Sequence, residues 1–287
     1  MIDLGAIGIW SRELRFGDAA EIPEAAAELD GLGFGALWIP DIGGPVLDAL
    51  DVLLRAAPQA VVATGILNVW MHDAVEVAAG QERFEREFPG RFLLGLGISH
   101  APIVDRDEPG RYRRPLSTMR DYLDRLDEAT SLRSRLLAAL GPRMLQLARE
   151  RTLGSHPYLV PVEHTAAARE ALGPGQLLAP ALSVVPDPDL PRARERARAD
   201  LALYLTLPNY TNTWQRLGFG DDELAAGGSD RLIDALYALG SPERIAERAR
   251  AHLAAGADHV CIRVVTGDPG DALPRAAWRE LAPAVIV

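Results

Sequence analysis

The residue types best suited to chemistry follow a short buried run near the middle of the chain. Phe92 to Gly97 is apolar with two glycines, and Ser99 and His100 come directly after it. A continuous apolar run indicates a parallel strand buried on both faces, and glycine in such a strand lets another group approach its backbone. Because imidazole exchanges protons near neutral pH, we predict His100 as the first candidate for acid–base catalysis.

Asp41 is the second catalytic candidate, because it follows another apolar run, Phe34 to Pro40. Its carboxylate could accept a hydrogen bond from a ring N–H or a hydroxyl. It could equally cap the turn that follows.

Gly141-Pro142-Arg143 is the best candidate for a phosphate site. Proline suits the first position of a helix, and glycine before it leaves room for an anion at the free N–H groups, which the helix dipole also favours. A plain strand-to-helix turn would use the same residues.

Three tryptophans, Trp10, Trp70 and Trp214, are predicted to line an apolar substrate pocket, although ordinary burial would also account for them. The six histidines are scattered and the chain has a single cysteine, so we expect no metal site.

The overall charge is −10, which disfavours nucleic acid and anionic membranes as partners. The chain contains no lysine, so any phosphate-binding cation must be an arginine. Five arginines form a local basic patch, which is either a solvated loop or a binding surface for an acidic group: Arg106, Arg111, Arg113, Arg114 and Arg120.

The elements that must position these residues alternate along the chain as apolar strands and amphipathic helices. About eight such units predict a (β/α)8 TIM barrel forming a single domain over residues 1–287, with a helical insertion between strands seven and eight. An open doubly wound sheet is the rival. The expected strands are 4–10, 34–40, 60–66, 92–97, 135–140, 155–160, 177–185 and 259–265.

Other segments lack a strand pattern. Residues 102–115 are expected to form a polar loop, 207–228 an irregular aromatic stretch and 231–239 a helix. One cysteine, no signal-peptide pattern and no long apolar run indicate a cytoplasmic protein that does not bind membranes.

Six short stretches, in order along nearly the whole chain, carry a family resemblance: 36–41, 63–66, 89–97, 138–143, 205–212 and 255–260. Together they resemble the bacterial luciferase-like oxidoreductase superfamily, and most closely its actinobacterial branch that uses the deazaflavin coenzyme F420.

The resemblance implies a TIM-like barrel that holds a flavin-type ring at the C-terminal rim. It implies a cis peptide at Gly65–Ile66 behind the ring, with Gly97 and Ser99 beside it, and a contact from Asp41 to the deazaflavin. The family's phosphate contacts fall on Ala139, Leu140 and Gly141.

The resemblance also implies hydride transfer between F420 and a small organic substrate, and a possible homodimer. The sequence departs from several relatives, because Ile42, Ser99 and Ala181 stand where those carry histidine or acids. A reduced-FMN monooxygenase and a flavin-binding protein without turnover are the alternatives. The basic patch favours F420, whose polyglutamate tail would contact arginines.

Overall fold

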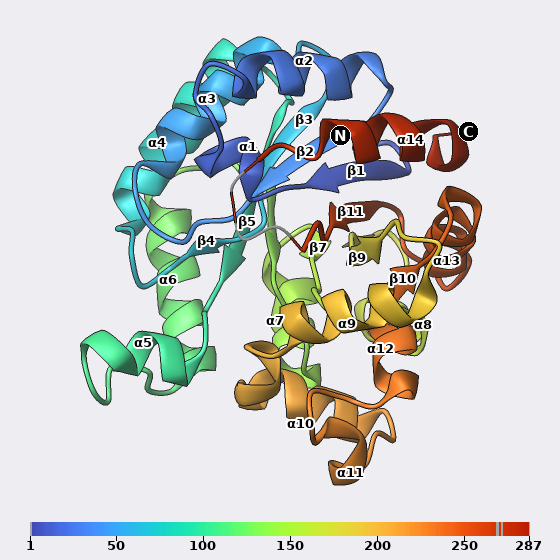
Figure 1. Cartoon of the computed structure of the whole chain (residues 1–287). Helices are drawn as coiled ribbons and strands as arrows, with labels where there is room; N and C mark the ends of the chain where they lie inside the picture. Colours follow the sequence, from blue (N-terminus) through green and yellow to red (C-terminus); the bar gives the residue numbers. More distant parts are fainter. Residues whose placement is uncertain (1, 268–269, 271, 287) are drawn as a thin grey trace.

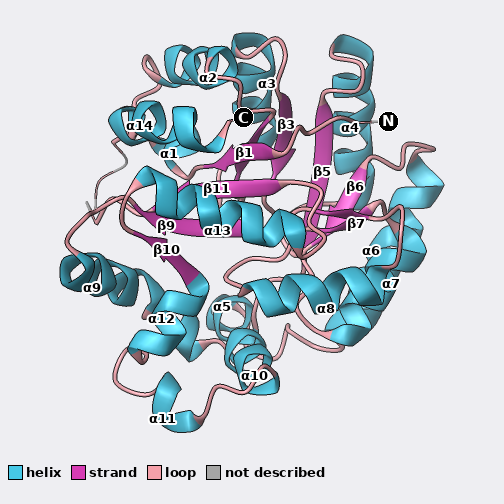
Figure 2. Ribbon diagram, turned by 90° about the vertical axis from the view of Figure 1, so that its right-hand side faces the viewer, coloured by secondary structure: helices cyan, strands magenta, loops and turns pink. Residues whose placement is uncertain are grey.

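A parallel sheet surrounded by helices forms the core of the molecule (Figures 1 and 2). The computed structural model describes residues 2–267, 270 and 272–286. Its strands are β1 (Ile7–Trp10), β2 (Ala36–Ile39), β3 (Val61–Thr64), β4 (Leu67–Asn68), β5 (Phe92–Gly97), β6 (Arg135–Leu137), β7 (Gly154–Ser155), β8 (Leu177–Leu178), β9 (Ala181–Val185), β10 (Tyr237–Leu239) and β11 (Val260–Val264).

The sheet closes into a barrel. Its order is β10-β9-β11-β1-β2-β3-β5-β6-β7-β8, the short β4 pairs with β5, and every pairing of these strands is parallel. In this order β8 lies at one end and β9 is second from the other end. Only Ala179 and Pro180 separate β8 from β9 in the chain, so the two ends of the sheet lie close together. A bridge from Tyr158 to Ala181 supports this closure. The predicted TIM-barrel fold is confirmed.

Most helices lie outside the barrel, and a second group forms the insertion between β9 and β11 (Figure 1). They are α1 (Glu13–Phe16), α2 (Ile22–Gly31), α3 (Val46–Ala56), α4 (Ala74–Glu87), α5 (Ala101–Asp107), α6 (Pro115–Ala129), α7 (Pro142–Arg151), α8 (Val162–Leu172), α9 (Leu190–Leu201), η1 (Tyr204–Thr206), α10 (Pro208–Arg216), α11 (Asp221–Leu224), α12 (Asp230–Leu236), α13 (Pro242–Ala254) and α14 (Arg275–Val285).

Three local predictions were wrong. The polar segment 102–115 contains most of α5, because Pro102 sits in the first turn of a helix and suits that position. Residues 207–228 contain α10 and α11. The end of the predicted helix 231–239 is strand β10, which pairs with β9 in the tertiary fold. The prediction of one domain over residues 1–287 remains a prediction.

Alternation along each strand sorts the side chains between two cores. Leu37 and Ile39 of β2 face the outer helices, whereas Ala36 and Trp38 join the cluster inside the barrel. The same rule makes Cys261 of β11 an inside residue, between Val260 and Ile262 on the helix side. The inward-facing side chains near the C-terminal end of each strand therefore lie at the C-terminal rim of the barrel.

Candidate active site

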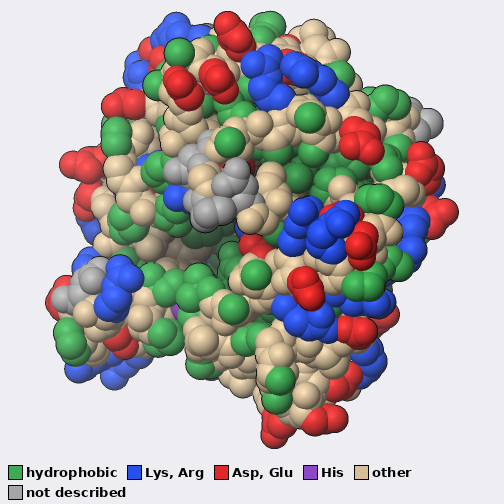
Figure 3. All heavy atoms as spheres, in the orientation of Figure 1, with side chains coloured by type: hydrophobic (Ala, Val, Ile, Leu, Met, Phe, Trp, Pro, Cys, Tyr) green, Lys and Arg blue, Asp and Glu red, His purple; other side chains and the backbone are tan. Residues whose placement is uncertain are grey.

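The C-terminal rim of the barrel carries the candidate site. Continuing the alternation brings Trp10 of β1 and Arg263 of β11 to the top of the barrel interior. In the space-filling view the surface is hollowed above α5 and α10 (Figure 3). The rim residues described below surround the strand ends from which ligands are reached in such barrels.

Trp10 and Tyr158 meet across the mouth of the barrel. Their rings stack at 6.0 Å between centroids with an interplanar angle of 25°. The Trp10 indole N–H donates to the carbonyl oxygen of Gly65 at 2.7 Å. This pair forms a half-buried aromatic floor beneath the rim.

An ion pair joins this floor to the insertion. Arg263 lies over the rings of Trp10 and Tyr158, 5.6 and 5.9 Å from their centroids. It donates to Asp200 of α9 at 2.6 and 2.7 Å and to the Tyr158 hydroxyl at 2.8 Å. Tyr237 of β10 also donates to Asp200, at 2.9 Å. These contacts fix the first helix of the insertion against the barrel.

The Gly65–Ile66 peptide is cis, as the resemblance predicted. The side chain of Ile66 lies against Gly97, where a Cβ atom would come within 2.4 Å of Ile66 Cδ1. A Cβ on Gly65 would come within 2.6 Å of Trp10 Nε1. Both glycines are therefore required for close packing on the inner side of the rim.

Asp41 is completely buried at the end of β2, and its surroundings are polar. Its Oδ2 accepts hydrogen bonds from the backbone N–H of Asn68 at 3.1 Å and from His72 Nε2 at 2.8 Å. Its Oδ1 has no hydrogen-bond partner, although the guanidinium of Arg15 lies 3.8 Å away. Burial lowers the pKa of Arg15, an effect that Asp41 opposes. The carboxylate thus keeps an acceptor site unused by the protein.

His100 precedes α5, and its ring faces the insertion. It lies 5.2 Å from the ring of Tyr210, and its Nδ1 is buried without a partner. Burial lowers the pKa of His100 to about 4, so the ring is neutral near pH 7. Ser99 has a φ of 55°, and its carbonyl oxygen accepts long hydrogen bonds from Tyr112 and Asn209.

At the start of α7, Gly141 is partly exposed and Pro142 is exposed. Among the described residues, a Cβ on Gly141 would have only Arg216 Nη2 within 4 Å, at 3.7 Å. Leu140 presents its carbonyl oxygen to His164 Nε2 at 2.9 Å, and Ala139 is buried behind it. Arg216 comes from α10, so the insertion supplies a cation beside the free N–H groups of this helix.

The three predicted substrate tryptophans differ in position. Trp10 is at the floor, and Trp70 donates from Nε1 to the carbonyl oxygen of Ile98 at 2.7 Å. Trp214 is fully buried in the insertion, where it donates to the carbonyl oxygen of Leu159 at 3.0 Å. We leave Trp214 out of the residues proposed to touch substrate, because it exposes no surface.

Sequence reasoning did not select Tyr158, Arg263, Asp200 or His72 as site residues. Arg263 was recognisable, because an arginine two residues after Cys261 in an apolar strand must share its face. Nothing in the sequence connects Asp200 with it, since the two residues are 63 positions apart.

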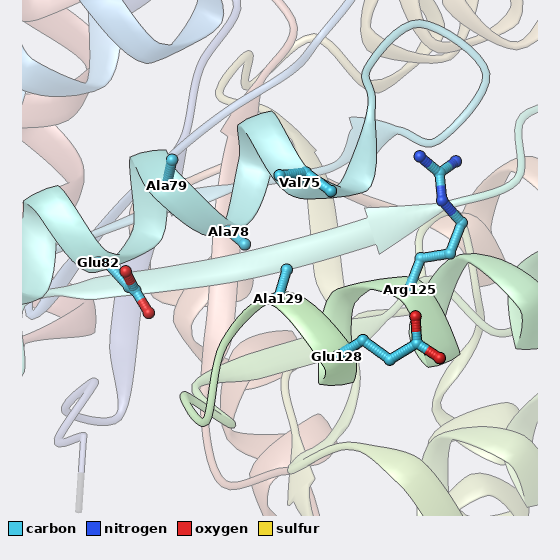
Figure 4. A pocket seen from close by; sticks show the side chains of 7 residues that line it. All are labelled: Val75, Ala78, Ala79, Glu82, Arg125, Glu128 and Ala129. Carbon is cyan, nitrogen blue, oxygen red and sulfur yellow. The ribbon is translucent and has the colours of Figure 1, made fainter.

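A surface depression lies away from the rim. A depression between α4 and α6 is lined by Val75, three alanines, Glu82, Arg125 and Glu128 (Figure 4), and contains none of the rim residues. Within the described part of the chain there is no cluster of three or more metal-ligating side chains, and no helix is long and apolar enough to cross a membrane.

The fold and the rim define the molecule as a (β/α)8 barrel with a candidate site at the C-terminal rim. Residues 6–135 match the family described as luciferase-like monooxygenase, which confirms the predicted resemblance to that superfamily over this part of the chain. No curated protein sequence matches the chain.

Solved structures show the same fold at low sequence identity. An F420-dependent secondary alcohol dehydrogenase is 16 % identical, with a TM-score of 0.72 and 98 % of each chain covered. The F420-dependent tetrahydromethanopterin reductase of Methanopyrus kandleri has the same four values. The oxygenating constituent of 3,6-diketocamphane monooxygenase from Pseudomonas putida, solved with FMN, is 13 % identical with a TM-score of 0.67, covering 98 % of this chain and 99 % of its own.

Proposed function

We propose that this protein is an F420-dependent oxidoreductase that transfers a hydride between the deazaflavin and a small organic substrate. The observation that carries the proposal is the open N-terminus of α7 beside Arg216, on the same rim as the buried acceptor of Asp41. When bound, the cofactor would supply the hydride chemistry, and the protein would bind, orient and exclude water.

The proposed ring site lies between β2, β3 and β5. Ile66 and Gly65 would support one face of the ring, and Gly97 and Ser99 would flank it. Asp41 has a free acceptor atom, Oδ1, suited to a ring N–H. A buried carboxylate with an unused lone pair is costly to leave unpaired, which favours a ligand at this position.

The proposed phosphate site is formed by Ala139, Leu140 and Gly141. The first N–H groups of α7 point at the anion and the helix dipole adds attraction. Arg216 supplies a positive charge, and His164 holds the Leu140 carbonyl in place.

For the substrate, Trp10 and Trp70 provide apolar surface at the rim. His100 is proposed beside them as a catalytic group, because its neutral imidazole can form a hydrogen bond with a substrate oxygen. A homodimer and a cytoplasmic location remain predictions.

A reduced-FMN monooxygenase is the second candidate, because FMN carries one phosphate that would use the same helix terminus. The five arginines of the basic patch distinguish the two, since all are exposed in or beside the segment between α5 and α6. A polyglutamate tail would gain from them, whereas FMN would not.

Fluorescence titration of the purified protein with F420 and with FMN, each at 50 and 300 mM salt, tests the proposal. We expect tighter binding of F420, weakened by salt because exposed charge pairs are screened. Preference for FMN would support the monooxygenase instead. Binding of neither by a folded sample would contradict both, and binding without turnover of any substrate would favour a flavin-binding protein.

A further inference from the structure

His72 and Asp41 form a carboxylate–imidazole pair at the rim. His72 Nε2 lies 2.8 Å from Asp41 Oδ2. Because an ionised carboxylate can only accept, the proton in this hydrogen bond lies on Nε2 of the imidazole. The second ring nitrogen, Nδ1, is therefore the atom free to exchange a proton.

Only the histidine of this pair is accessible to solvent. The Asp41 side chain is fully buried, whereas 21 % of the His72 side chain is accessible. A buried carboxylate that hydrogen-bonds a partly accessible imidazole fixes its tautomer and the orientation of its ring. The accessible side lets the imidazole regain its proton from solvent.

Backbone contacts attach the pair to the proposed ring site. The Asp41 N–H donates to the carbonyl oxygen of Ile66 at 3.2 Å, and the Asn68 N–H donates to the Asp41 carboxylate. Trp70, two residues before His72, is held by the Ile98 carbonyl of the neighbouring strand end. The loop that carries His72 is thereby fixed at the end of β4, next to Ile66.

Other histidines are less suited to proton transfer. His156 and His259 donate from Nδ1 to backbone carbonyls inside the barrel, and His164 is bonded to Leu140. His252 is buried against Thr165. None of these four has a carboxylate partner among the contacts of the described residues.

We propose that His72 is the acid–base group of the reaction and that Asp41 is its positioning residue. The inference rests on the proposed function. In carbonyl reduction, a bound deazaflavin would supply the hydride to the carbonyl carbon, and the carbonyl π electrons would move to oxygen. That oxygen takes the proton from His72 Nδ1, which leaves a neutral imidazole with its other proton on Nε2. In alcohol oxidation, Nδ1 accepts the hydroxyl proton.

Carbethoxylation by diethyl pyrocarbonate, followed by mass spectrometry of the peptide that contains His72, tests this assignment without a substrate. With saturating F420 we expect the modification rate of His72 to fall by about tenfold or more, because the bound ring excludes reagent from Nδ1. A parallel fluorescence titration measures whether F420 is bound.

Asp41→Asn tests the positioning role in the protein without cofactor. We expect a three- to tenfold lower rate at His72, because the amide no longer accepts the Nε2 proton and so no longer keeps the reactive lone pair on Nδ1. Modification of His100 in the same samples serves as the control and should be unchanged. His72→Gln confirms the assignment of the modified peptide.

Two results would overturn the inference. One is bound F420 with His72 still reacting at the rate of the free protein. The other is an unchanged His72 rate in folded Asp41→Asn. If neither F420 nor FMN binds, the proposed function fails first, and the inference falls with it.

Discussion

Gly141 is the N-cap residue of α7, and a Cβ atom there would make only an ordinary contact with Arg216 Nη2 at 3.7 Å. At the residue scale, Gly141→Asp should abolish cofactor binding without unfolding the barrel. The new carboxylate would cap the helix itself and repel the cofactor phosphate. Titration of the folded variant checks this, with Gly141→Ala as the control that retains binding. Wild-type affinity in Gly141→Asp would disprove the phosphate assignment.

Gly97 provides a second prediction at this scale. Gly97→Ala should lower the free energy of unfolding by about 1–3 kcal/mol, because the added methyl overlaps Ile66. Urea denaturation measures this, and the additional change Ile66→Ala should recover part of the loss by making room. Gly31→Ala is the control, since nothing lies within 4 Å of its Cβ position, and it should stabilise by about 0.5–1 kcal/mol. Equal effects at both glycines would contradict the packing argument.

At the element scale, the ion pair between Arg263 of β11 and Asp200 of α9 joins the insertion to the barrel. Their side chains are only 19 % and 13 % exposed. Arg263→Met should therefore destabilise by about 2–3 kcal/mol, somewhat less than the cost of breaking a fully buried pair. Chemical denaturation measures the change.

The matched control for that pair is the exposed contact of Arg55 with Asp51, where Arg55→Met should cost less than about 1 kcal/mol. The double variant Arg263→Met with Asp200→Leu should regain stability over Arg263→Met alone, because no unpaired charge remains. If the double variant lost as much free energy of unfolding as the two single variants together, the role of the pair would be contradicted.

At the scale of the whole molecule, buried histidines make stability depend on pH. Burial lowers the pKa of His156, His252 and His259 to about 4 each. The unfolded chain binds these protons near pH 6.5, so it binds more protons than the folded chain between pH 6.5 and 4. Their contribution is therefore complete above pH 6.5 and is lost as pH falls toward 4.

Thermal unfolding from pH 7 to 4.5 measures this effect. We expect the midpoint temperature to fall with pH. The reason is that the free energy of unfolding decreases by up to about 1.4 kcal/mol per pH unit for each histidine. His252→Gln should make the slope shallower. A midpoint independent of pH over this range would contradict the burial of neutral imidazoles.

Several of the proposed site residues could be selected from the sequence, because their signals are local. Apolar runs mark strands, and the residues after them must lie at one rim in a parallel barrel, which is how Asp41, Ser99 and His100 were found. Gly141 with Pro142 is a helix-start pattern that needs no tertiary information. The resemblance added the position of the Gly65–Ile66 cis peptide.

Other features were not predictable from local patterns. Strand β10 is three residues long and becomes a strand only by pairing with β9. The helices α10 and α11 lie in an aromatic, glycine-containing segment, and their packing against the insertion core overrides a weak local pattern.

By itself, the sequence therefore determined the succession of strands and helices, the barrel class and the set of residues at the strand ends, because these follow from hydrophobic periodicity and helix capping within a few neighbouring residues. Only the tertiary structure decided which of these residues meet. Asp41 and His72 are 31 positions apart and Arg263 and Asp200 are 63, and their contacts depend on strand register, loop path and closure of the sheet. Those properties arise from the packing of the whole chain.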